Sequence, residues 1–506
     1  MVKMNEYFNY GQDHLTPEKA LKIARKEIIG IISDETKVKI RKSYDAVQTI
    51  AKGDNLVYSI NTGFGSLCTT KITAKETGRL QENLLKSHSV GVGAPIPQEI
   101  AKLMLILKVH ALCKGYSGIS LEVVERINWH IERNIIPLVP EKGSVGASGD
   151  LAPLSHLFLP LIGLGYLSKD GINFSSSIEL LNEFDLEPLT LQAKEGVALI
   201  NGTQFIAAFA ILVYEKFSNC LEHADLIGAL SLEAYLGSPQ PFNERLINLR
   251  PHQGAVFVAK RFRNLLKNSQ FIESHKDCGR VQDPYSFRCI PQVHGASRDA
   301  FSHFSEVLEC ELNSVTDNPI VFDEKYTVSG GNFHGQPLAL PLDYLSFAAS
   351  ELGNISDRRI YLLLEGKWGL PSYLVKESGL NSGFMIAQYC SAALVSENKT
   401  HCFPASADSI PTSMGQEDHV SMGSISARKA LEIIENLEKI LAIELLCAAQ
   451  AFDFRRPLKS SEILESCHKY IRNKIPHIFE DTILSELINS AAEIIHSREL
   501  LKIMNK

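Results

Sequence analysis

The sequence lacks any regular spacing of cysteine. Its ten cysteines are scattered through 506 residues, without a C-x-x-C pair or a metal-ligand spacing. We therefore expect neither a disulfide framework nor a metal site, but reduced thiols in a cytoplasmic protein. The amino terminus has no apolar core of signal-peptide length, so no export is expected.

Long apolar runs are absent as well. The most apolar segment, 157–167, is interrupted by Pro160, Gly163 and Gly165 and is much shorter than the roughly 20 residues of a membrane span. We interpret it as buried helix and expect no membrane association.

Positive charge is not in excess. The net charge of −7 gives no basic stripe for nucleic acid, so a small soluble substrate is the better expectation. The glycine-rich nucleotide motifs G-x-G-x-x-G and G-x-x-x-x-G-K-[ST] do not occur, and no strict G-x-S-x-G elbow surrounds Ser148.

The dominant pattern in the sequence is the helical periodicity of its apolar residues. Apolar residues recur at i, i+3 and i+4 over 100–111, after two prolines, which predicts an amphipathic helix. Ser120 is a candidate N-cap for a second helix, which the break at Pro137 ends.

Longer runs with the same period cover 338–353, 355–364 and about 421–452. Helices of this length are typical of bundles or subunit interfaces. With 45% hydrophobic residues the chain can bury a large core. We predict a mainly α fold, with an amino-terminal domain over 1–200 and a carboxy-terminal helical-bundle domain over 201–506.

One segment can form a cofactor from the chain itself. Residues 143–156 read G-S-V-G-A-S-G-D-L-A-P-L-S-H. If a tight turn brings the nitrogen of Gly149 against the carbonyl carbon of Ala147, ring closure and loss of two waters give 4-methylidene-imidazole-5-one, a strong electrophile. Ser148 supplies the hydroxyl that is eliminated, and the glycines permit a compressed backbone. Taken alone, Ala-Ser-Gly is more often an ordinary turn ahead of a helix, with Asp150 as N-cap.

The whole segment favours the chemical interpretation. G-x-x-G-A-S-G-D-L-x-P-L-x-H resembles the active-site signature of the aromatic amino acid ammonia-lyases, and the resemblance extends from about residue 20 to the carboxyl end. It implies a mainly α, long-helix bundle of the fumarase/aspartase-like superfamily. Its amino-terminal, mostly helical domain carries the loop on which 4-methylidene-imidazole-5-one forms from Ala147, Ser148 and Gly149, without an external cofactor.

A second block resembles the one that supplies the family's base. Residues 58–65 read Y-S-I-N-T-G-F-G, similar to Y-G-x-N-T-G-F-G, which implies that Tyr58 removes a proton from the substrate. A phenol with a pKa near 10 is a poor base unless positive charge or hydrogen-bond donors stabilise the phenolate. Ser59 stands where the family usually has glycine, a departure that leaves the phenol untouched.

A third block contains an arginine suited to a carboxylate. Residues 282–289 read Q-D-P-Y-S-F-R-C, similar to the family's Q-D-x-Y-S-x-R. The resemblance implies that Arg288 binds the substrate carboxylate, with Gln282 beside it and Tyr285 among the catalytic residues. A planar guanidinium is suited to this because it binds a carboxylate through two parallel hydrogen bonds.

The resemblance places two further residues at the electrophile. Asn201, in K-E-G-V-A-L-I-N-G-T, corresponds to a catalytic asparagine that contacts the ring oxygen and can stabilise negative charge there. Phe333, in G-G-N-F-H-G, corresponds to a phenylalanine that lines the pocket. Alone, Asn before Gly is an ordinary turn pair, and one aromatic residue is simply core.

Substrate choice depends on two places. His88 falls where the family keeps its selectivity residues, and residues 416–422 read Q-E-D-H-V-S-M, similar to the block of the family's histidine branch, which the run 405–413 also matches. Glu417 is the sharper indicator, because the phenylalanine and tyrosine branches lack this acid. A carboxylate can accept an imidazole N–H, whereas beside a benzene ring it would be desolvated without a partner.

Two departures bear on the exact substrate. Met414-Gly415 stand where many members of the histidine branch have Ala-Asn, and Gly335-Gln336 stand where many have Ala-Glu. Neither changes the expected reaction class.

The resemblance therefore implies conversion of L-histidine to trans-urocanate and ammonia. The β-proton of histidine is hardly acidic and ammonia is a poor leaving group. An electrophile addresses both difficulties, whether the substrate amine or the imidazole adds to it, and both routes stay open. As general base, Tyr58 would contribute about 10²- to 10⁴-fold in rate. Loops of neighbouring subunits complete each site in the family, which implies a homotetramer.

Three alternatives stand beside this interpretation. A tyrosine or phenylalanine ammonia-lyase, or a related aminomutase, would share most blocks and is separated by a product assay. A fumarase/aspartase-type lyase shares the bundle but carries a G-S-S-x-M-P loop, which is absent here. A binding or structural protein with a degenerate site would lack the ring, although every position named above holds a competent residue.

Overall fold

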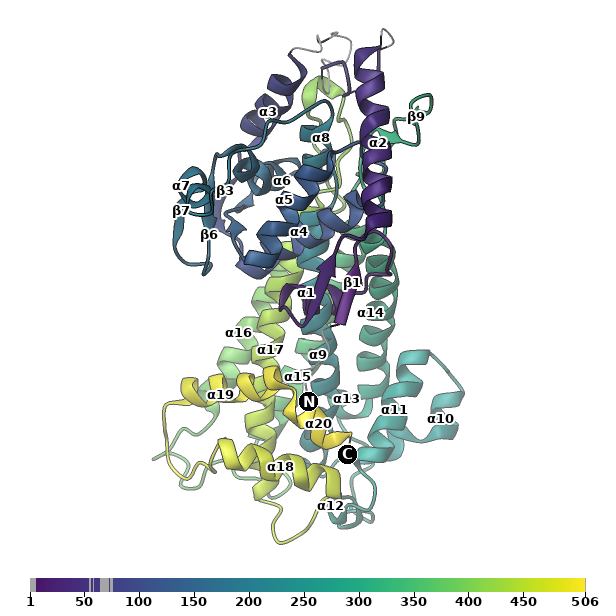
Figure 1. The fold of residues 1–506 in the computed structure, drawn as a ribbon. Coiled ribbons are helices and arrows are strands. Elements are labelled where there is room, and N and C mark those ends of the chain that lie inside the picture. Colours follow the sequence, from purple (N-terminus) through teal and green to yellow (C-terminus); the bar gives the residue numbers. More distant parts are fainter. Residues whose placement is uncertain (1–5, 54–55, 58, 64–71, 73–75, 506) are drawn as a thin grey trace. The chain divides into compact units, whose positions relative to one another are not determined.

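The computed structural model describes residues 6–53, 56–57, 59–63, 72 and 76–505, and helices dominate it (Figure 1). Two compact units divide the chain, and each combines three segments. The first unit comprises Met1–Leu212, Ser305–Leu342 and Pro404–Arg428; the second comprises Val213–Phe304, Asp343–Phe403 and Lys429–Lys506. The predicted domains are each continuous in sequence, and their division at residue 200 stays a prediction.

The first unit combines short helices with small sheets. Its elements are β1 (Glu6–Asn9), α1 (Pro17–Ala24), β2 (Ile28–Ile31), α2 (Asp34–Lys52), α3 (Thr77–His88), β3 (Val92–Pro95), α4 (Gln98–Leu112), α5 (Leu121–Arg133), β4 (Ile136–Pro137), β5 (Pro140–Lys142), α6 (Leu151–Phe158), η2 (Leu159–Ile162), β6 (Tyr166–Ser168), β7 (Phe174–Ser176), α7 (Ser177–Asn182), α8 (Glu195–Ile200), β8 (Ile320–Val321), β9 (Thr327–Val328) and η4 (Ser413–Gly415). β1 and β2 pair in parallel, whereas β3–β5, β4–β6–β7 and β8–β9 pair antiparallel.

The second unit is helical in its described elements. Its elements are η3 (Gln240–Phe242), α10 (Glu244–Asn248), α11 (Gln253–Leu265), α12 (Gln270–Glu273), α13 (Tyr285–Arg288), α16 (Met385–His401), α18 (Glu462–Lys474), α19 (Leu484–Ser497) and α20 (Glu499–Met504). Four long helices contribute residues to both units: α9 (Gln204–Ala234), α14 (Ile290–Leu312), α15 (Gln336–Leu364) and α17 (Gly423–Asp453).

The predicted helices are present. α4 covers the run 100–111 and α17 covers the long run near 421–452. The amphipathic character expected of 100–111 is wrong, because α4 is buried on all its faces from Ile100 to His110. α5 begins after Ser120, whose hydroxyl accepts a hydrogen bond from the backbone N–H of Val123, and it ends at Asn134, which adopts a left-handed conformation. The two runs predicted at 338–353 and 355–364 form one continuous helix, α15.

The interpretation of 157–167 as buried helix is wrong beyond its first residues. α6 ends at Phe158, a 3₁₀ turn follows over Leu159–Ile162, and β6 begins at Tyr166. Pro160 has no backbone N–H, and Gly163 adopts φ 75°, so an α-helix cannot continue through them.

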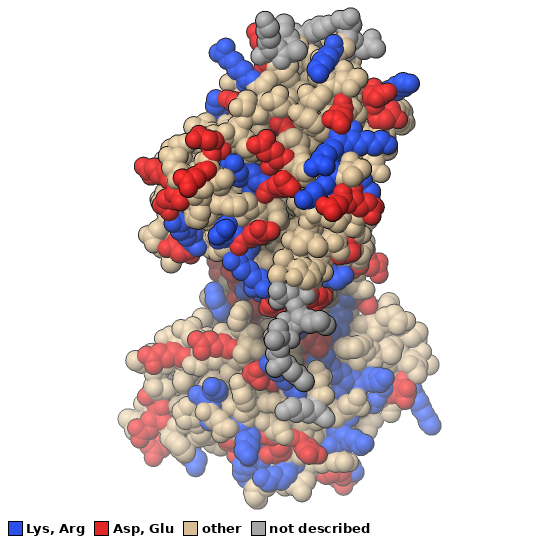
Figure 2. Space-filling model, in the orientation of Figure 1, with Lys and Arg blue, Asp and Glu red and all other residues tan. Residues whose placement is uncertain are grey.

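Surface charge is mixed on the face that Figure 2 shows, where Lys and Arg side chains lie interspersed with Asp and Glu side chains. Within the described residues, no helix is both long and apolar enough to cross a membrane.

Candidate active site

The loop before α6 forms a tight turn with Ala147 and Ser148 at its tip. The backbone N–H of Gly149 donates to the carbonyl oxygen of Gly146 at 3.3 Å. Ser148 has φ 47° and Gly149 has φ 87°, both in the left-handed region. A Cβ atom placed on Gly149 would lie 2.2 Å from the carbonyl oxygen of Gly202 and 2.9 Å from that of Phe333, so only glycine fits. This compressed turn fits the formation of 4-methylidene-imidazole-5-one from Ala147, Ser148 and Gly149.

The residue after Asn201 lies directly against this turn. Gly202 donates its N–H to the carbonyl of Ser148 at 3.1 Å, and its carbonyl accepts from the N–H of Asp150 at 2.9 Å. Asn201 is buried, and its Nδ2 donates to the carbonyl oxygen of Asn318 at 2.8 Å. Asn201 therefore immediately precedes a residue whose backbone contacts the Ala147–Gly149 turn, and its carboxamide is held by Asn318.

Asp150 occupies the N-cap position of α6, but its side chain links the turn to α9. As N-cap of α6 its side chain makes no cap hydrogen bond; instead Oδ2 accepts from the N–H groups of Phe205 at 3.0 Å and Ile206 at 3.1 Å, in the first turn of α9. Burial raises the pKa of Asp150 to about 7, against the opposing effect of these hydrogen bonds and of Lys108.

Two buried lysines surround Asn201, and the sequence patterns did not single them out. Lys108 donates to the carbonyl oxygens of Asn201 at 2.5 Å and Ala198 at 3.2 Å, and burial lowers its pKa to about 7 while Asp317 opposes that shift. Lys194 pairs with Asp317 at 2.7 Å, and the other oxygen of Asp317 lies 3.4 Å from Nδ2 of Asn201. The available signal was a lysine within the apolar run of α4, since a buried lysine requires partners.

The segment after Glu417 contacts the same loop. Met422 donates its N–H to the carbonyl of Val145 at 3.0 Å, and the hydroxyl of Ser424 donates to the carbonyl of Ser144 at 2.8 Å. Glu417 itself is half-buried, and its Oε2 accepts a hydrogen bond from Oγ1 of Thr412 at 3.0 Å.

The block that contains Phe333 contacts both the turn and the segment of Glu417. The close approach of its carbonyl oxygen to Gly149 places Phe333 at the turn. Nε2 of the next residue, His334, lies 3.3 Å from the carbonyl oxygen of His419, and the two imidazole rings stack with centroids 5.8 Å apart.

His88 ends α3 and lies within electrostatic range of Glu417. Burial lowers its pKa, whereas the carbonyl of Leu84 and the charge of Glu417 act in the opposite direction. Its Nδ1 is 3.0 Å from the hydroxyl of Ser87. The backbone just beyond His88 approaches the loop too, since a Cβ atom on Gly143 would lie 3.1 Å from Cα of Gly91.

Three of the remaining predicted residues belong to the other unit. Gln282, Tyr285 and Arg288 belong to the second unit, at α13 and the segment before it. Gln282 is exposed, Tyr285 is 70% exposed, and the guanidinium of Arg288 lies 4.6 Å from the centroid of the Tyr285 ring. Nε of Arg288 is buried and has no hydrogen-bond partner within the described residues. Tyr58 lies outside the residues that the structure describes.

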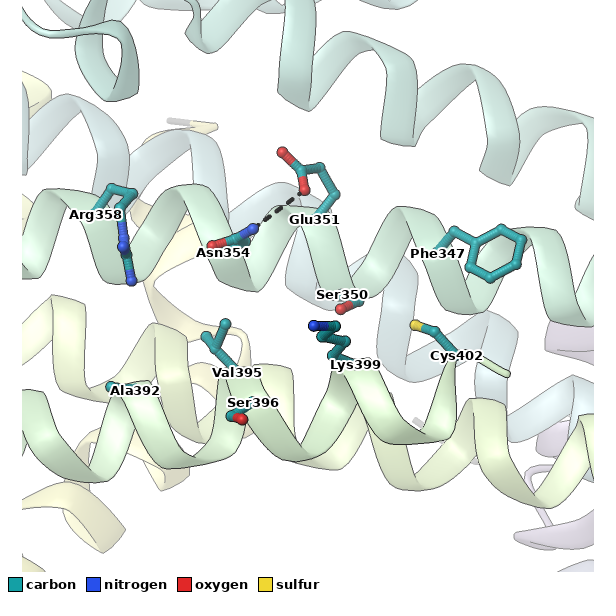
Figure 3. A pocket seen from close by; sticks show the side chains of 10 residues that line it. All are labelled: Phe347, Ser350, Glu351, Asn354, Arg358, Ala392, Val395, Ser396, Lys399 and Cys402. Atoms are coloured by element: carbon teal, nitrogen blue, oxygen red, sulfur yellow. Dashed lines mark hydrogen bonds between the residues drawn. The ribbon is translucent and has the colours of Figure 1, made fainter. Parts of the chain in front are cut away.

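The structure thus places seven predicted residues in the first unit: His88, Ala147, Ser148, Gly149, Asn201, Phe333 and Glu417. Ala147, Ser148 and Gly149 form the turn, the carbonyl of Phe333 approaches it, and His88 and Glu417 interact with each other electrostatically. A separate groove of about 450 Å³ lies between α15 and α16 of the second unit, where Arg358 and Lys399 line it with Glu351 and Cys402 (Figure 3). None of the predicted site residues lines this groove, so it is not the candidate active site.

Comparisons with known proteins give a consistent result. The family described as aromatic amino acid lyase matches residues 15–473. A histidine ammonia-lyase of Sorangium cellulosum is 48% identical over 469 residues, which cover 91% of each chain. The crystal structure of histidine ammonia-lyase from Trypanosoma cruzi matches with a TM-score of 0.91 and 42% identity, over 99% of this chain and 95% of that one. Tyrosine aminomutase from Streptomyces globisporus matches with a TM-score of 0.92 and 34% identity, over 99% and 98%.

The fold class predicted from the sequence is confirmed by these likenesses. The molecule is mainly α, and its solved neighbours have the long-helix bundle of the fumarase/aspartase-like superfamily.

Proposed function

This chain belongs to the aromatic amino acid lyase family, and on that premise we propose that it converts L-histidine to trans-urocanate and ammonia, the first step of histidine degradation, in the cytoplasm. The position of Glu417 in the structure is the observation that supports histidine as the substrate. Its segment contacts the loop that presents Ala147, Ser148 and Gly149, and its charge acts on His88.

Ala147, Ser148 and Gly149 would hold the internal 4-methylidene-imidazole-5-one group. Once formed, that group supplies an electrophile, which makes the elimination of ammonia and the loss of a β-proton possible. The residues around it are this chain's own contribution: Asn201 precedes Gly202, whose backbone contacts the turn, and the backbone carbonyl of Phe333 lies close to Gly149. Nζ of Lys108 donates to the backbone carbonyl of Asn201 and adds positive potential there in its protonated form.

Glu417 and His88 form the imidazole-binding part of the site. The hydroxyl of Thr412 donates a hydrogen bond to Oε2 of Glu417. Oε1 therefore remains available to accept an N–H of the substrate imidazole. Burial holds His88 toward its neutral form, in which one ring nitrogen donates and the other accepts. A benzene ring offers neither group a partner, so the pair favours histidine over phenylalanine.

Arg288 binds the substrate carboxylate and Tyr58 removes the β-proton. The Arg288 guanidinium stacks on Tyr285, and Gln282 completes the polar surroundings. Because Gln282 and Tyr285 are exposed, they are available to the site of a neighbouring subunit, and we propose a homotetramer whose sites are shared between subunits.

The test is a product assay with histidine, tyrosine and phenylalanine offered side by side to the purified protein. We expect urocanate as the main product, and an intact mass lower than the sequence mass by two waters. Ser148→Ala should keep the fold but lose both the mass change and nearly all activity. Faster formation of coumarate or cinnamate would contradict histidine as substrate, and formation of a β-amino acid would indicate an aminomutase.

Glu417→Gln tests whether the charge of Glu417 selects histidine as the substrate, because glutamine keeps the size and hydrogen-bonding ability of the side chain but removes its charge. A charged hydrogen bond contributes about 1.5–3 kcal/mol, so kcat/KM for histidine should fall about ten- to a hundredfold. If Glu417→Gln formed urocanate at the wild-type rate, Glu417 would have no part in substrate binding, whereas the proposed role of Ser148 would be unaffected.

A further inference from the structure

The segment that carries Gln282, Tyr285 and Arg288 is fastened to the turn after α9 within the second unit. Arg280 forms an ion pair with Asp283, with Nη1 to Oδ1 at 2.7 Å, and the same Nη1 donates to the carbonyl of Leu236 at 3.1 Å. The other oxygen of Asp283 accepts the N–H of Ser238 at 2.5 Å. The two charged side chains are only 11% and 3% exposed, so water screens this pair little.

Aromatic rings enclose the Arg280 guanidinium. Its Cζ lies 3.8 Å from the centroid of the Trp368 ring and 5.0 Å from that of Tyr235. Tyr235 also stacks on Phe287, with centroids 4.7 Å apart and an interplanar angle of 21°. One tyrosine therefore contacts the beginning of the segment through Arg280 and its end through fully buried Phe287.

These anchors determine which side chains face outward. Asp283 and Phe287 are buried, whereas Gln282 is exposed and Tyr285 is 70% exposed. Arg288 stacks on Tyr285 and is only partly buried. The residues proposed for substrate binding thus alternate with residues that fasten the backbone.

We propose that Arg280 is a positioning residue for the substrate carboxylate. Together with Asp283 it forms a clamp that fixes the backbone from which Gln282, Tyr285 and Arg288 project. The proposal rests on the role given above to Arg288, but it concerns a carboxylate that every α-amino acid shares, so it does not depend on histidine being the substrate.

Arginine is required at this position because lysine reproduces only part of its contacts. A guanidinium is planar, lies flat on aromatic rings and directs several N–H groups in fixed directions, whereas an ammonium is a compact point charge. Lysine could retain attraction to Asp283 but would lose the stack on Trp368. Loss of the clamp should affect binding of the carboxylate before it affects the fold.

The experiment compares Arg280→Lys with Arg456→Lys. Arg456 is a control from the same unit, since it pairs with Glu465 at 2.7 Å and lies 5.3 Å from the Phe452 ring centroid. For the substrate that the wild type turns over best, we expect KM to rise about tenfold in Arg280→Lys, with a smaller change in kcat. Arg456→Lys should keep the wild-type KM, and both variants should keep the loss of two waters in intact mass.

Two further measurements separate positioning from folding. Added ethylguanidinium should restore part of the binding in Arg280→Ala, which a merely unfolded variant would not show. In a Ser148→Ala background, titration calorimetry with the amino acid that the wild type turns over best reports binding without turnover, and Arg280→Lys should weaken that binding about tenfold. A wild-type KM in folded Arg280→Lys, or an equal rise in Arg456→Lys, would overturn the clamp. A wild type that keeps its full sequence mass and makes no product would instead overturn the proposed function.

Discussion

The hydroxyl of Thr412 donates a hydrogen bond to Oε2 of Glu417 at 3.0 Å, across a turn that the same two residues close with their backbones. The N–H of Thr412 donates to the carbonyl of Glu417 at 2.9 Å, and the N–H of Glu417 lies 3.4 Å from the carbonyl of Thr412. Between them, Ser413, Met414 and Gly415 adopt φ values of 52°, 57° and 87°. The departure from Ala-Asn noted in the sequence therefore lies at the tip of this turn, where Met414 is 94% exposed, and not at the carboxylate.

Thr412→Val should lower kcat/KM for histidine about tenfold. Valine has nearly the same shape as threonine but cannot donate to Glu417, so the carboxylate loses its fixed orientation and keeps two competing acceptor oxygens. Steady-state kinetics with histidine and phenylalanine measure the effect, which should be confined to the substrate with an imidazole. Thr412→Ser retains the hydroxyl and should retain most of the activity. Equal kinetics for Thr412→Val and wild type would show that the hydrogen bond does not orient Glu417.

Gly149→Ala should abolish cofactor formation. A Cβ atom at this position meets carbonyl oxygens at 2.2 and 2.9 Å, and the φ of 87° is strained for alanine. We expect intact mass to show no loss of two waters and activity to fall more than about a hundredfold, because the turn cannot form. Gly331→Ala is the matched control, since no atom lies within 4 Å of a Cβ placed there. A normal mass loss in Gly149→Ala would contradict the need for glycine.

Patterns local in sequence predicted local structure well, and contacts between distant segments less well. The period of apolar residues found α4, α5 and α17, because apolar side chains three and four residues apart lie on one side of a helix and pack together. Only α5 buries a single face, whereas α4 is buried all round, which the apolar period alone did not indicate. The same reasoning failed after Phe158, where a buried apolar segment has no period that separates helix from strand.

In the candidate site, too, local patterns were predicted but contacts between distant segments were not. The glycine-rich segment predicted a compressed turn, but nothing in its spacing indicates that the Asp150 side chain accepts hydrogen bonds from α9. Arg280 was not predicted either, because a charged residue in a loop is ordinarily solvated. Its role is visible only after folding places Trp368 3.8 Å from its guanidinium.

Ser59→Gly should stabilise the protein by about 1–2 kcal/mol. Ser59 is fully buried with φ 60°, and within the described residues its hydroxyl has no hydrogen-bond partner. The left-handed region costs a residue with a Cβ atom about 1 kcal/mol, and glycine removes that cost together with the buried hydroxyl. Urea unfolding measures the change. Ser59→Ala removes the hydroxyl but keeps the Cβ atom, so its free energy of unfolding should rise less than that of Ser59→Gly. If both variants were stabilised equally, the buried hydroxyl alone, and not the left-handed backbone, would be what destabilises the wild type.

His130→Asn should make the protein less sensitive to acid. His130 is buried, its Nδ1 lies 2.9 Å from the carbonyl of Ile135, and its Nε2 has no partner within the described chain. Burial lowers its pKa to about 4, from an unfolded value near 6.5. Between these values the unfolded chain binds a proton that the folded chain does not, so the free energy of unfolding falls as pH falls, by about 1.4 kcal/mol per pH unit for this group.

Asparagine can still donate to Ile135 but does not titrate, so the variant should lose about 2–3 kcal/mol less than wild type between pH 6.5 and 4.5. The remaining acid sensitivity includes His110 and His223, whose pKa values burial also lowers to about 4. Urea unfolding at several pH values measures the difference in slope. His303→Asn, at an exposed position, is the control and should retain a steeper pH dependence than His130→Asn. Identical slopes for wild type and His130→Asn would show that His130 takes up no proton on unfolding in this range.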